Sequence, residues 1–410
     1  MEKAHTFDVI IIGGGIVGAS LALALSDSNL TIALLDQRKL NASYKKPAAK
    51  FSSRVSALTE ASINLFQNLN VWPRMLAQRV CPYRYMRIWD GEGTGAINFD
   101  ANTVSRDAIG YIVENDVIRN ALLAELEKTT VSLYESQPEV TFDLDTSQKQ
   151  VVLSNGNVLD GKLLVAADGA ESRLRKEADI VSSQKDYMHH CIVTTVETDH
   201  YHHDTAWQIF LDTGPLAFLP LPSINKKHYC SVVWSLVPDQ AESIMALDNK
   251  TFCERLQEAF EKRLGYIIHT EPRVCFPLKQ RHALNYYRRN VVLVGDAAHT
   301  IHPLAGQGLN LGLMDTAVLT EEILRANRRQ DNIAGDHILA RYQRRRKGDN
   351  TTMLKAMAGF QHLFSANDLT VRWLRNSGLK TINNFPILKE LIIRQALGIS
   401  GNLPALVKAH

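Results

Sequence analysis

The first 36 residues contain the pattern that most limits how this chain can fold. An apolar run at residues 7–12 predicts a buried strand, and a G-x-G-x-x-G pattern follows it at Gly13, Gly15 and Gly18. Residues 19–25 have helical character, and residues 31–35 predict a second strand that ends in Asp36. An acidic residue about 20 positions after the glycines can accept hydrogen bonds from an adenosine ribose. The segment therefore predicts a dinucleotide site on a parallel α/β sheet.

A second glycine-rich segment lies near residue 300. Residues 291–294 predict a buried strand that ends at Gly295 and Asp296. A carboxylate at the C-terminal tip of a parallel strand lies where such sheets bind ligands. The loop that follows contains Pro303, Gly306 and Gly308. Helical spacing then begins at Leu309 and Asn310. The resulting helix N-terminus favours negative charge, such as the N1–O2 edge of a reduced flavin, so the two segments together favour FAD.

Three shorter stretches between these segments are further candidates. Arg54 precedes residues 56–66, where we expect a helix with Ser56 as its N-cap, and the arginine could pair with a phosphate, lie over the flavin or remain at the surface. Residues 114–116 are expected to cap a helix over 117–126. A strand from residue 162 ends at Asp168 and Gly169, with Arg175 shortly after; this group would lie beside a pyrophosphate or form a simple turn.

The middle of the chain has mostly strand-like periodicity. Residues 83–89 and 95–99 predict two strands around a turn at Asp90 and Gly91, and Asn155-Gly156 predicts a hairpin. Residues 189–237 contain four strand-like runs and no phosphate-binding loop, followed by a helix over 251–264. We interpret this part as a β-sheet substrate domain covering the cofactor. The expected division is a discontinuous FAD-binding domain (1–80, 100–180 and 280–345), a substrate domain (81–99 and 181–279) and a helical C-terminal region (346–410).

Composition argues against nucleic-acid binding, disulfide-based stability and a membrane-spanning segment. A net charge of +3 over 410 residues does not suggest nucleic-acid binding. The five cysteines are scattered without a Cys-x-x-Cys pair, which fits reduced thiols in a cytoplasmic compartment. Residues 9–25 are apolar but contain the glycine pattern, so we interpret them as a buried strand and helix; no other run is long enough to cross a bilayer.

Histidines and a basic run leave alternatives open. The group at residues 200–204 lacks helical His-x-x-x-His spacing and a cysteine partner, so we expect a polar loop and no metal site. His299 and His302 could transfer a proton to flavin or substrate, or be ordinary polar loop residues. The basic run at 338–347 predicts a solvated face or a contact with acidic lipids. Apolar residues over 373–393 could pack on the body, form a subunit contact or face a membrane-dissolved substrate.

These motifs together resemble a known family. The glycine pattern, Asp168-Gly169 with Arg175, and Gly295-Asp296 resemble the three motifs of the flavoprotein aromatic hydroxylases, the class A monooxygenases. The strings at residues 54–57, 113–115, 295–308 and 393–398 resemble the ubiquinone-biosynthesis hydroxylases (the UbiH/UbiF/UbiI/Coq6 group). Residues 312–315 and the C-terminal tail are most similar to the UbiI (VisC) branch.

The resemblance implies a fold, a mechanism and a set of site residues. The fold would be a Rossmann-like FAD-binding domain of the glutathione-reductase and p-hydroxybenzoate-hydroxylase type. NAD(P)H would bind transiently and reduce FAD, and dioxygen would form a flavin C4a-hydroperoxide that hydroxylates a phenol ring. The ADP half would contact Gly13, Gly15, Gly18 and Asp36. Pyrophosphate and ribityl would contact Arg54, Glu114 and Asp296, although the family position of Glu114 often carries Arg or Gln. The ring would contact Gly308, Leu309 and Asn310, and Pro303 would face substrate.

By resemblance, the substrate is a polyprenylated phenol, hydroxylated at C5 in the UbiI branch. An almost insoluble tail implies association with the inner membrane or with a ubiquinone-biosynthesis complex, and a homo-oligomer is expected. Two other classes remain open. A hydroxylase of a small, soluble aromatic acid would need an arginine or tyrosine for the carboxylate, and residues 206–236 contain no arginine. The other is a non-catalytic, flavin-dependent assembly subunit or redox sensor.

Overall fold

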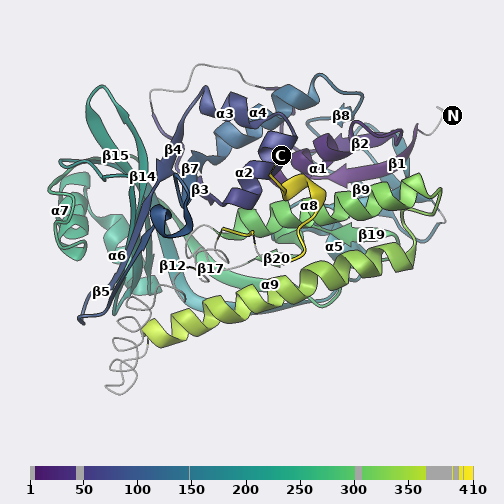
Figure 1. The fold of residues 1–410 in the computed structure, drawn as a ribbon. Helices are drawn as coiled ribbons and strands as arrows, with labels where there is room; N and C mark the ends of the chain where they lie inside the picture. The colour runs from purple at the N-terminus through teal and green to yellow at the C-terminus, as the bar shows by residue number, and fades with distance from the viewer. Residues whose placement is uncertain are drawn as a thin grey trace.

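A computed structural model describes residues 5–42, 50–146, 148–300, 307–365, 390, 397–399 and 401–409. Two large sheets lie at opposite ends of the elongated molecule, and long helices run between them (Figure 1). Pro303, Gly306 and His302, together with most of the predicted apolar cluster at 373–393, fall outside the described residues. Among the helices that are described, none is both long enough and apolar enough to span a membrane.

The two strands of the N-terminal segment join three later strands to form the parallel sheet that the sequence predicts. Its central strands run in the order β19, β11, β1, β2, β8, all parallel: Val291–Leu293, Val158–Ala166, His5–Ile12, Ile32–Leu35 and Ser132–Tyr134. Three antiparallel additions complete it: β18 (Tyr287–Arg288), β10 (Lys149–Val152) and β9 (Thr141–Asp143). The hairpin predicted at Asn155-Gly156 joins β10 to β11, and Gly156 has φ +86°. The C-terminal ends of β1, β2 and β19 carry the predicted cofactor residues.

The nine-stranded sheet at the other end is formed mainly by residues 182–283. Its main path runs β20, β17, β12, β15, β14, β13, β5, β6: His299–Thr300, Val274–Ala283, Ser182–Thr198, Lys227–Leu236, Gly214–Ile224, Thr205–Leu211, Tyr85–Asp90 and Ala96–Asp100. The predicted hairpin around Asp90-Gly91 is confirmed as β5 and β6. A further strand, β16 (Ile267–Thr270), pairs with β12. One face of this sheet is covered by α6 (Pro238–Ala246) and α7 (Asn249–Ala259), which ends earlier than the predicted 264.

A three-stranded sheet lies between the two large ones and corrects one prediction. Residues Val55–Leu58 do not begin a helix with Ser56 as its N-cap; they form strand β3, which pairs with β7 (Gly110–Glu114). The third strand is β4 (Val80–Tyr83). Helix α2 begins later, at Glu60, and its N-cap is Thr59, whose hydroxyl accepts the Ser62 N–H. Pairing with β7 satisfies the backbone of residues 55–58 in a way that local spacing does not reveal.

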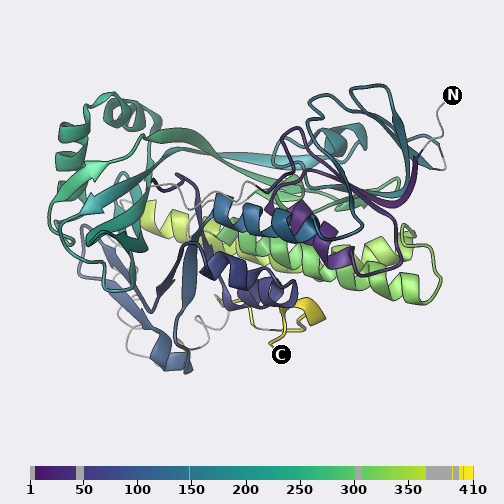
Figure 2. The same ribbon diagram turned by 90° about the horizontal axis from the view of Figure 1, so that it is seen from above.

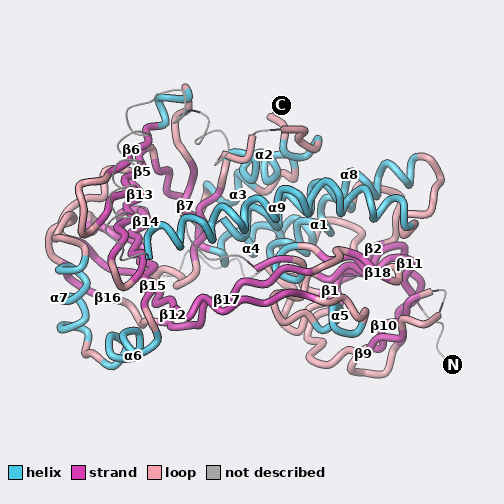
Figure 3. The backbone as a smooth tube through the Cα atoms, turned by 90° about the horizontal axis from the view of Figure 1, so that it is seen from below, coloured by secondary structure: helices cyan, strands magenta, loops and turns pink. Residues whose placement is uncertain are grey.

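Four helices pack around the parallel sheet. Helix α1 (Ile16–Leu25) follows β1 and packs against α4 (Asn115–Leu126), which confirms the helix predicted after residues 114–116. Helices α8 (Gln307–Arg328) and α9 (Asp336–Ser365) run side by side along the molecule (Figures 1 and 2). Seen from below, both helices lie beside β1 and β18 at one end, and α9 extends toward the nine-stranded sheet at the other (Figure 3).

The remaining short helices occur at connections. They are α3 (Trp72–Leu76), α5 (Arg173–Glu177), and the 3₁₀ turns Ala101–Val104, Gly295–Ala297 and Ala405–Val407. The last of these packs on α2, because the Asn64 amide donates to the carbonyl oxygen of Val407 (3.1 Å). The end of the described chain therefore lies beside α2, near the middle of the molecule (Figure 1).

Candidate functional site

The first glycine turn contains two kinds of glycine. Gly13 has φ +111°, and a Cβ there would lie 2.3 Å from the carbonyl oxygen of Ala167; a Cβ on Gly18 would lie 1.9 Å from the oxygen of Gly13. Both positions are glycine because the chain packs against itself. Gly15 differs, since a Cβ at this position would meet nothing within 4 Å. The space beside Gly15 is therefore available to something other than the protein.

Helix α1 begins at this open position. Gly15 is its N-cap and contributes no side-chain hydrogen bond, and the first turn contains no acidic residue. The N–H groups of a helix's first turn have no partner within the helix, and they attract anions. An uncapped N-terminus without a carboxylate of its own, next to a backbone left open by Gly15, fits the pyrophosphate of a dinucleotide.

Asp36 lies beside the glycine turn, and its contact with a ribose remains a prediction. Its Oδ2 accepts the Gly14 N–H (2.7 Å), and its Oδ1 accepts the Arg38 N–H (2.7 Å). The guanidinium of Arg38 lies 3.3 Å from Oδ1 and is mostly exposed, so a ribose hydroxyl would displace this side chain. Sequence reasoning missed Arg119, whose Nε donates to the carbonyl oxygen of Gly14 (3.1 Å). Its position one turn into α4, the helix predicted to follow residues 114–116, was the available signal.

The turn after β19 forms the other end of the site. Gly295 has φ +59° and is followed by Asp296, whose side chain is solvent-accessible. Surrounding protein nevertheless raises the pKa of the Asp296 carboxyl by desolvation, while His299 and Arg54 act to lower it. The Asp296 carboxyl is therefore accessible to solvent and is also partly desolvated by neighbouring protein atoms. The structure thus brings the charges of Arg54 and Asp296 near one another, as the sequence prediction requires.

Asp168 and Gly169 connect the two ends of the site. One Asp168 oxygen accepts the N–H groups of Arg173 (2.8 Å) and Leu174 (3.3 Å), and Gly169 has φ +86°. Arg175 is 2% exposed and donates to the carbonyl oxygens of Ala297 (2.8 Å) and Ala170 (2.9 Å). The arginine therefore ties this turn to the Gly295–Ala297 turn, and both donations go to the chain itself. Contact of Asp168 and Gly169 with the cofactor remains a prediction.

Two predicted cofactor residues have side chains that are used inside the protein. Glu114 is buried; its Oε1 accepts the Ser52 N–H (2.6 Å), and its Oε2 lies 2.8 Å from Nε of Arg79, a residue that sequence reasoning missed. Burial raises the pKa of Glu114, and the Ser52 N–H and Arg79 oppose that rise. The Glu114 carboxylate holds residues 52 and 79, which differs from the predicted pyrophosphate or ribityl contact.

The Asn310 side chain is likewise turned into the body of the protein. Its amide donates to the carbonyl oxygen of Ala57 (2.8 Å), and its Oδ1 accepts from the Ser62 hydroxyl (2.8 Å) and the Thr59 N–H (3.1 Å). These bonds fasten the first turn of α8 to β3 and α2. Because the Asn310 side chain is bonded to the chain, a contact between this segment and a flavin would use the backbone of Gly308, Leu309 and Asn310.

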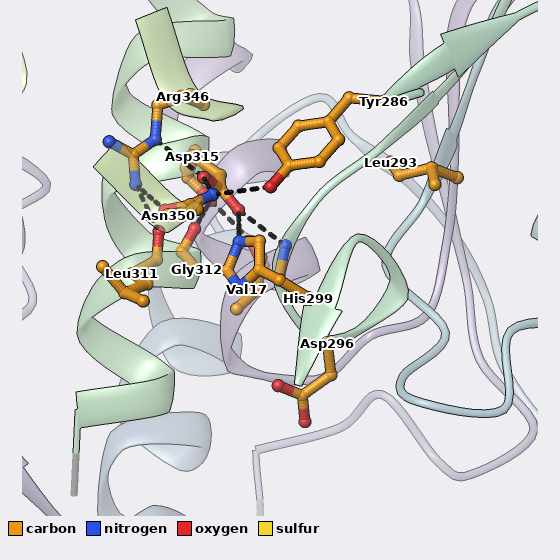
Figure 4. Close-up of polar contacts among 12 residues, drawn as sticks. Val17, Tyr286, Leu293, Asp296, His299, Leu311, Gly312, Asp315, Arg346 and Asn350 are labelled. Atoms are coloured by element: carbon orange, nitrogen blue, oxygen red, sulfur yellow. Dashed lines mark hydrogen bonds and ion pairs between the residues drawn. The ribbon is translucent and has the colours of Figure 1, made fainter. Parts of the chain in front are cut away.

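His299, on strand β20, contacts a buried charged cluster formed by residues of α8 and α9 (Figure 4). Its Nε2 donates to Asp315 (2.5 Å), whose other oxygen accepts from Arg346 Nε (2.7 Å). Arg346 belongs to the run 338–347, for which a solvated face was predicted, yet it is 2% exposed. Arg341 and Arg345 also pair inward, with Glu322. The predicted solvated face is therefore wrong for these three arginines, because acidic residues of α8 face them.

The histidines near residue 200 have local partners. His202 is buried and donates from Nε2 to the carbonyl oxygen of Leu221 (2.9 Å), and the Tyr201 hydroxyl bonds to Asp204 (2.5 Å). Within the described part of the chain, no three metal-ligating side chains come together.

The arrangement as a whole fits one long, charged cofactor. An anion site at α1 and an acid at the end of β2 lie at one end, and Asp296 with Arg54 lies at the other. The α1 N-terminus, Asp36 and Asp296 follow the C-terminal ends of the parallel strands β1, β2 and β19. Such strand ends are where open α/β sheets bind dinucleotides. The open space at Gly15 supports the fit of such a cofactor, because packing within the chain gives no reason for glycine at this position.

Comparison with known proteins agrees with this geometry. Residues 6–356 match the FAD binding domain family. In overall structure the chain is similar to p-nitrophenol 4-monooxygenase PnpA from Pseudomonas putida DLL-E4 (TM-score 0.75, 18% identity, 96% of this chain and 98% of that one). It is also similar to Pseudomonas aeruginosa PqsL in complex with 2-aminobenzoylacetate (TM-score 0.75, 22% identity, 92% and 100%). At these identities the likeness establishes the fold. Fold, site and family match define an FAD-dependent aromatic-ring monooxygenase, which uses NAD(P)H and dioxygen.

Three curated relatives define the family more closely. The chain is 34% identical to 3-demethoxyubiquinol 3-hydroxylase of Escherichia coli (strain K12), over 96% of this chain and 98% of the relative. It is 33% identical to ubiquinone biosynthesis monooxygenase COQ6, mitochondrial, of Danio rerio (96% and 90%). It is 32% identical to ubiquinone hydroxylase UbiL of Rhodospirillum rubrum (95% and 89%). The chain belongs to the flavoprotein hydroxylase family of ubiquinone biosynthesis.

Proposed function

We propose that this protein hydroxylates the aromatic ring of a polyprenylated phenol in ubiquinone biosynthesis, and that the reaction is C5 hydroxylation of a 2-polyprenylphenol. The observation that carries the proposal is the composition of one face of the nine-stranded sheet. Support also comes from the relatives, one of which is named a ubiquinone biosynthesis monooxygenase and two of which are named hydroxylases of ubiquinone or demethoxyubiquinol. The bound flavin supplies the oxidising chemistry, and the protein has to orient the ring and exclude water.

The face in question is the one opposite α6 and α7. Side chains alternate along each strand, and the odd-numbered positions of β15, from Tyr229 to Ser235, point toward the three-stranded sheet. Leu219 and Leu221 of β14 and Ala206 and Phe210 of β13 share this face. The wall is mainly apolar, and strands β12 to β15 contain no arginine. Such a wall suits a prenylated ring better than an aromatic carboxylate, which would need a cation.

Two hydroxyls in this wall can orient a ring oxygen. Thr195 of β12 lies directly across from Ser231 of β15, and both residues are at most 2% exposed. Neither hydroxyl has a hydrogen-bond partner among the described residues. Buried hydroxyls normally find partners, so we propose that a phenol oxygen becomes their partner when substrate binding displaces the side chains that cover them. We assign them to ring orientation within the proposed reaction.

A second substrate is favoured by one specific finding. The relative with 34% identity is named as a hydroxylase of 3-demethoxyubiquinol, whose ring already carries more oxygen substituents than a 2-polyprenylphenol. Hydroxylation of such a ring is therefore the second candidate. A hydroxylase of small aromatic acids is disfavoured by the apolar wall. A non-catalytic flavin subunit would share Asp296 and Arg54, so the product assay below separates it from a hydroxylase.

The decisive experiment measures NADPH oxidation by the purified, FAD-loaded protein. It is run without substrate, with a short-tailed 2-prenylphenol, and with a short-tailed demethoxyubiquinol, and products are identified by mass and NMR. Stimulated oxidation with a C5-hydroxylated phenol supports the first proposal, and product from the second substrate alone supports the second. Bound FAD with stimulation by neither ring, in the presence of membranes and of cell extract, would argue against both.

The same proposal includes an organisation for the whole chain. We propose the division of residues into an FAD-binding domain, a substrate domain and a helical C-terminal region given under Sequence analysis. Because a polyprenyl tail partitions into lipid, we further propose a cytoplasmic protein that works at the periphery of the inner membrane or in a complex, as a homo-oligomer. Flotation with liposomes and light scattering of the purified protein test these two points.

A further inference from the structure

A buried cluster of hydrogen-bond donors surrounds the Asp315 carboxylate of α8. Asp315 is 0% exposed, and four groups of the chain donate to its two oxygens. On one oxygen these are the Gly295 N–H (3.0 Å) and His299 Nε2 (2.5 Å). On the other they are Arg346 Nε (2.7 Å) and Asn350 Nδ2 (3.3 Å). One carboxylate therefore joins the cofactor turn, the strand after it and helix α9 (Figure 4).

The Gly295 N–H needs such an acceptor. It opens the 3₁₀ turn Gly295–Ala297, whose N-cap Val294 provides no side-chain hydrogen bond, and Gly295 has the left-handed φ of +59°. A buried, unpaired N–H in this position would weaken the turn. Asp315 supplies the acceptor from α8, a neighbouring element.

Close packing allows α8 to reach the turn. A Cβ added to Gly312, one turn before Asp315, would lie 2.8 Å from Val17 Cγ2 and 3.1 Å from the Cα of Gly295. The Thr316 hydroxyl, next along the helix, is 3.3 Å from the carbonyl oxygen of Val17. Helix α8 therefore touches the first turn of α1 and the Gly295 turn at once.

Helix α9 keeps the carboxylate in place and charged. The Arg346 Nη2 donates to Asn350 Oδ1 (2.8 Å), and Asn350 donates to the Tyr286 hydroxyl (3.1 Å), so the guanidinium has one orientation. Burial alone would raise the pKa of Asp315, but His299 and Arg346 hold it at about 2. The side chain of Asp296, the next residue after Gly295, points away from this cluster (Figure 4).

We infer that Asp315 is a positioning residue for the cofactor: through the Gly295 N–H it sets the turn that presents Asp296 to the flavin, and Arg346 of α9 fixes Asp315. His299 belongs to the same hydrogen-bond network, which gives this histidine a positioning role and accounts for its burial. The inference rests on the proposed assignment of Asp296 to the cofactor. It adds Asp315, Arg346 and His299 as residues that act on the cofactor through Asp296.

The test compares FAD dissociation constants of apoprotein variants by flavin fluorescence. Asp315→Asn keeps the shape and loses the charge, so we expect the FAD dissociation constant to rise about tenfold, as for loss of a charge-assisted hydrogen bond. The matched control is Asp349→Asn, which removes a carboxylate 3.2 Å from the same Arg346 but 73% exposed. It should leave the constant within about twofold of the parent value.

A double-mutant cycle separates positioning from general loosening. If Asp315 acts through Asp296, then Asp315→Asn combined with Asp296→Ala will bind FAD as weakly as Asp296→Ala alone. The inference would be overturned if the two substitutions raised the FAD dissociation constant by factors that multiply in the double variant. It would also be overturned if a folded Asp315→Asn variant bound FAD with unchanged affinity. The flavin reduction potential gives a second readout, which should move in Asp315→Asn and Asp296→Ala together and stay unchanged in Asp349→Asn.

A second variant covers a failure of Asp315→Asn to fold. Gly312→Ala leaves every charge in place and pushes α8 from the Gly295 turn, so it should weaken FAD binding and show the same lack of additivity with Asp296→Ala. Unchanged affinity in Gly312→Ala would refute the inference. If Asp296→Ala alone leaves FAD binding unchanged, the site assignment fails instead, which distinguishes the two outcomes.

Discussion

Replacing Gly15 with alanine should separate cofactor binding from folding. Gly15 has φ −73° and ψ −175°, an extended conformation that alanine adopts without strain, and the added methyl group would meet no protein atom within 4 Å. The fold therefore has no need of glycine here. The methyl group would instead occupy the space beside the uncapped N-terminus of α1, where a pyrophosphate would approach the backbone.

The magnitudes follow from this geometry. Removing glycine's extra freedom in the unfolded chain stabilises the apoprotein by about 0.4–1 kcal/mol, and alanine is a poorer N-cap than glycine by a similar amount. The two effects nearly cancel, so the apoprotein's free energy of unfolding should change by less than about 1 kcal/mol. Loss of one hydrogen bond to a charged group costs about 1.5–3 kcal/mol, so the FAD dissociation constant should rise roughly ten- to a hundredfold.

Two glycines provide matched controls. Gly348→Ala in α9 also adds a methyl group to open space, and it should leave FAD affinity unchanged. Gly18→Ala places a Cβ 1.9 Å from the oxygen of Gly13, so it should destabilise the apoprotein as well. Affinity is measured by flavin fluorescence and stability by urea unfolding of the apoprotein. A Gly15→Ala protein that binds FAD like the parent would show that the open space is not the pyrophosphate site.

Three other predictions test separate parts of the structure. Arg175→Met should lower the free energy of unfolding by about 2 kcal/mol in urea titrations, since it leaves the buried Ala297 carbonyl without its donor. Burial and nearby cations lower the pKa of His282 from 6.5 to about 4, so between these pH values the unfolded chain binds more protons than the folded one. The free energy of unfolding, measured in urea, should therefore fall as the pH drops from 6.5 to about 4, and it should fall less in His282→Gln. The double variant Thr195→Val, Ser231→Ala should form about two- to tenfold less product per NADPH consumed, with NADPH oxidation in the absence of substrate unchanged. An unchanged ratio of product to NADPH would show that the two hydroxyls do not orient the ring.

Local pattern was enough to predict the first half of the site. Strand β1, the glycine turn, α1, β2 and Asp36 follow each other directly, so hydrophobic spacing and glycine placement determine them without knowledge of distant contacts. The same is true of β19 and the turn at Gly295. Parallel strands bring these two segments to one edge of the sheet, although 280 residues separate Gly15 from Gly295.

Contacts between distant segments account for what the sequence could not predict. Residues 55–58 have apolar spacing compatible with a helix, but β7 is available to pair with them. Arg346 lies in a run of basic residues that is typical of a solvated face, yet Asp315, 31 positions earlier, draws it into the interior. Local spacing indicates neither β7 nor Asp315 as a partner. In the first case the pairing satisfies backbone groups of residues 55–58, and in the second it satisfies the buried Asp315 carboxylate.

Asp36 is buried and bonded to the chain at the expected ribose position, but for the other motif residues accessibility separates those that serve a ligand from those that serve the fold. Gly15, Arg54 and Asp296 are reachable from solvent or border open space, although all lie in segments identified from sequence. Glu114, Asn310 and Asp315 lie in the same segments but are buried, and their polar atoms bond to the chain. A carboxylate or amide with its acceptors and donors already engaged would lose those bonds in order to hold a cofactor. Substitution of the buried group should therefore affect FAD through backbone geometry, whereas substitution of the accessible group should remove a contact directly, with the apoprotein's stability preserved.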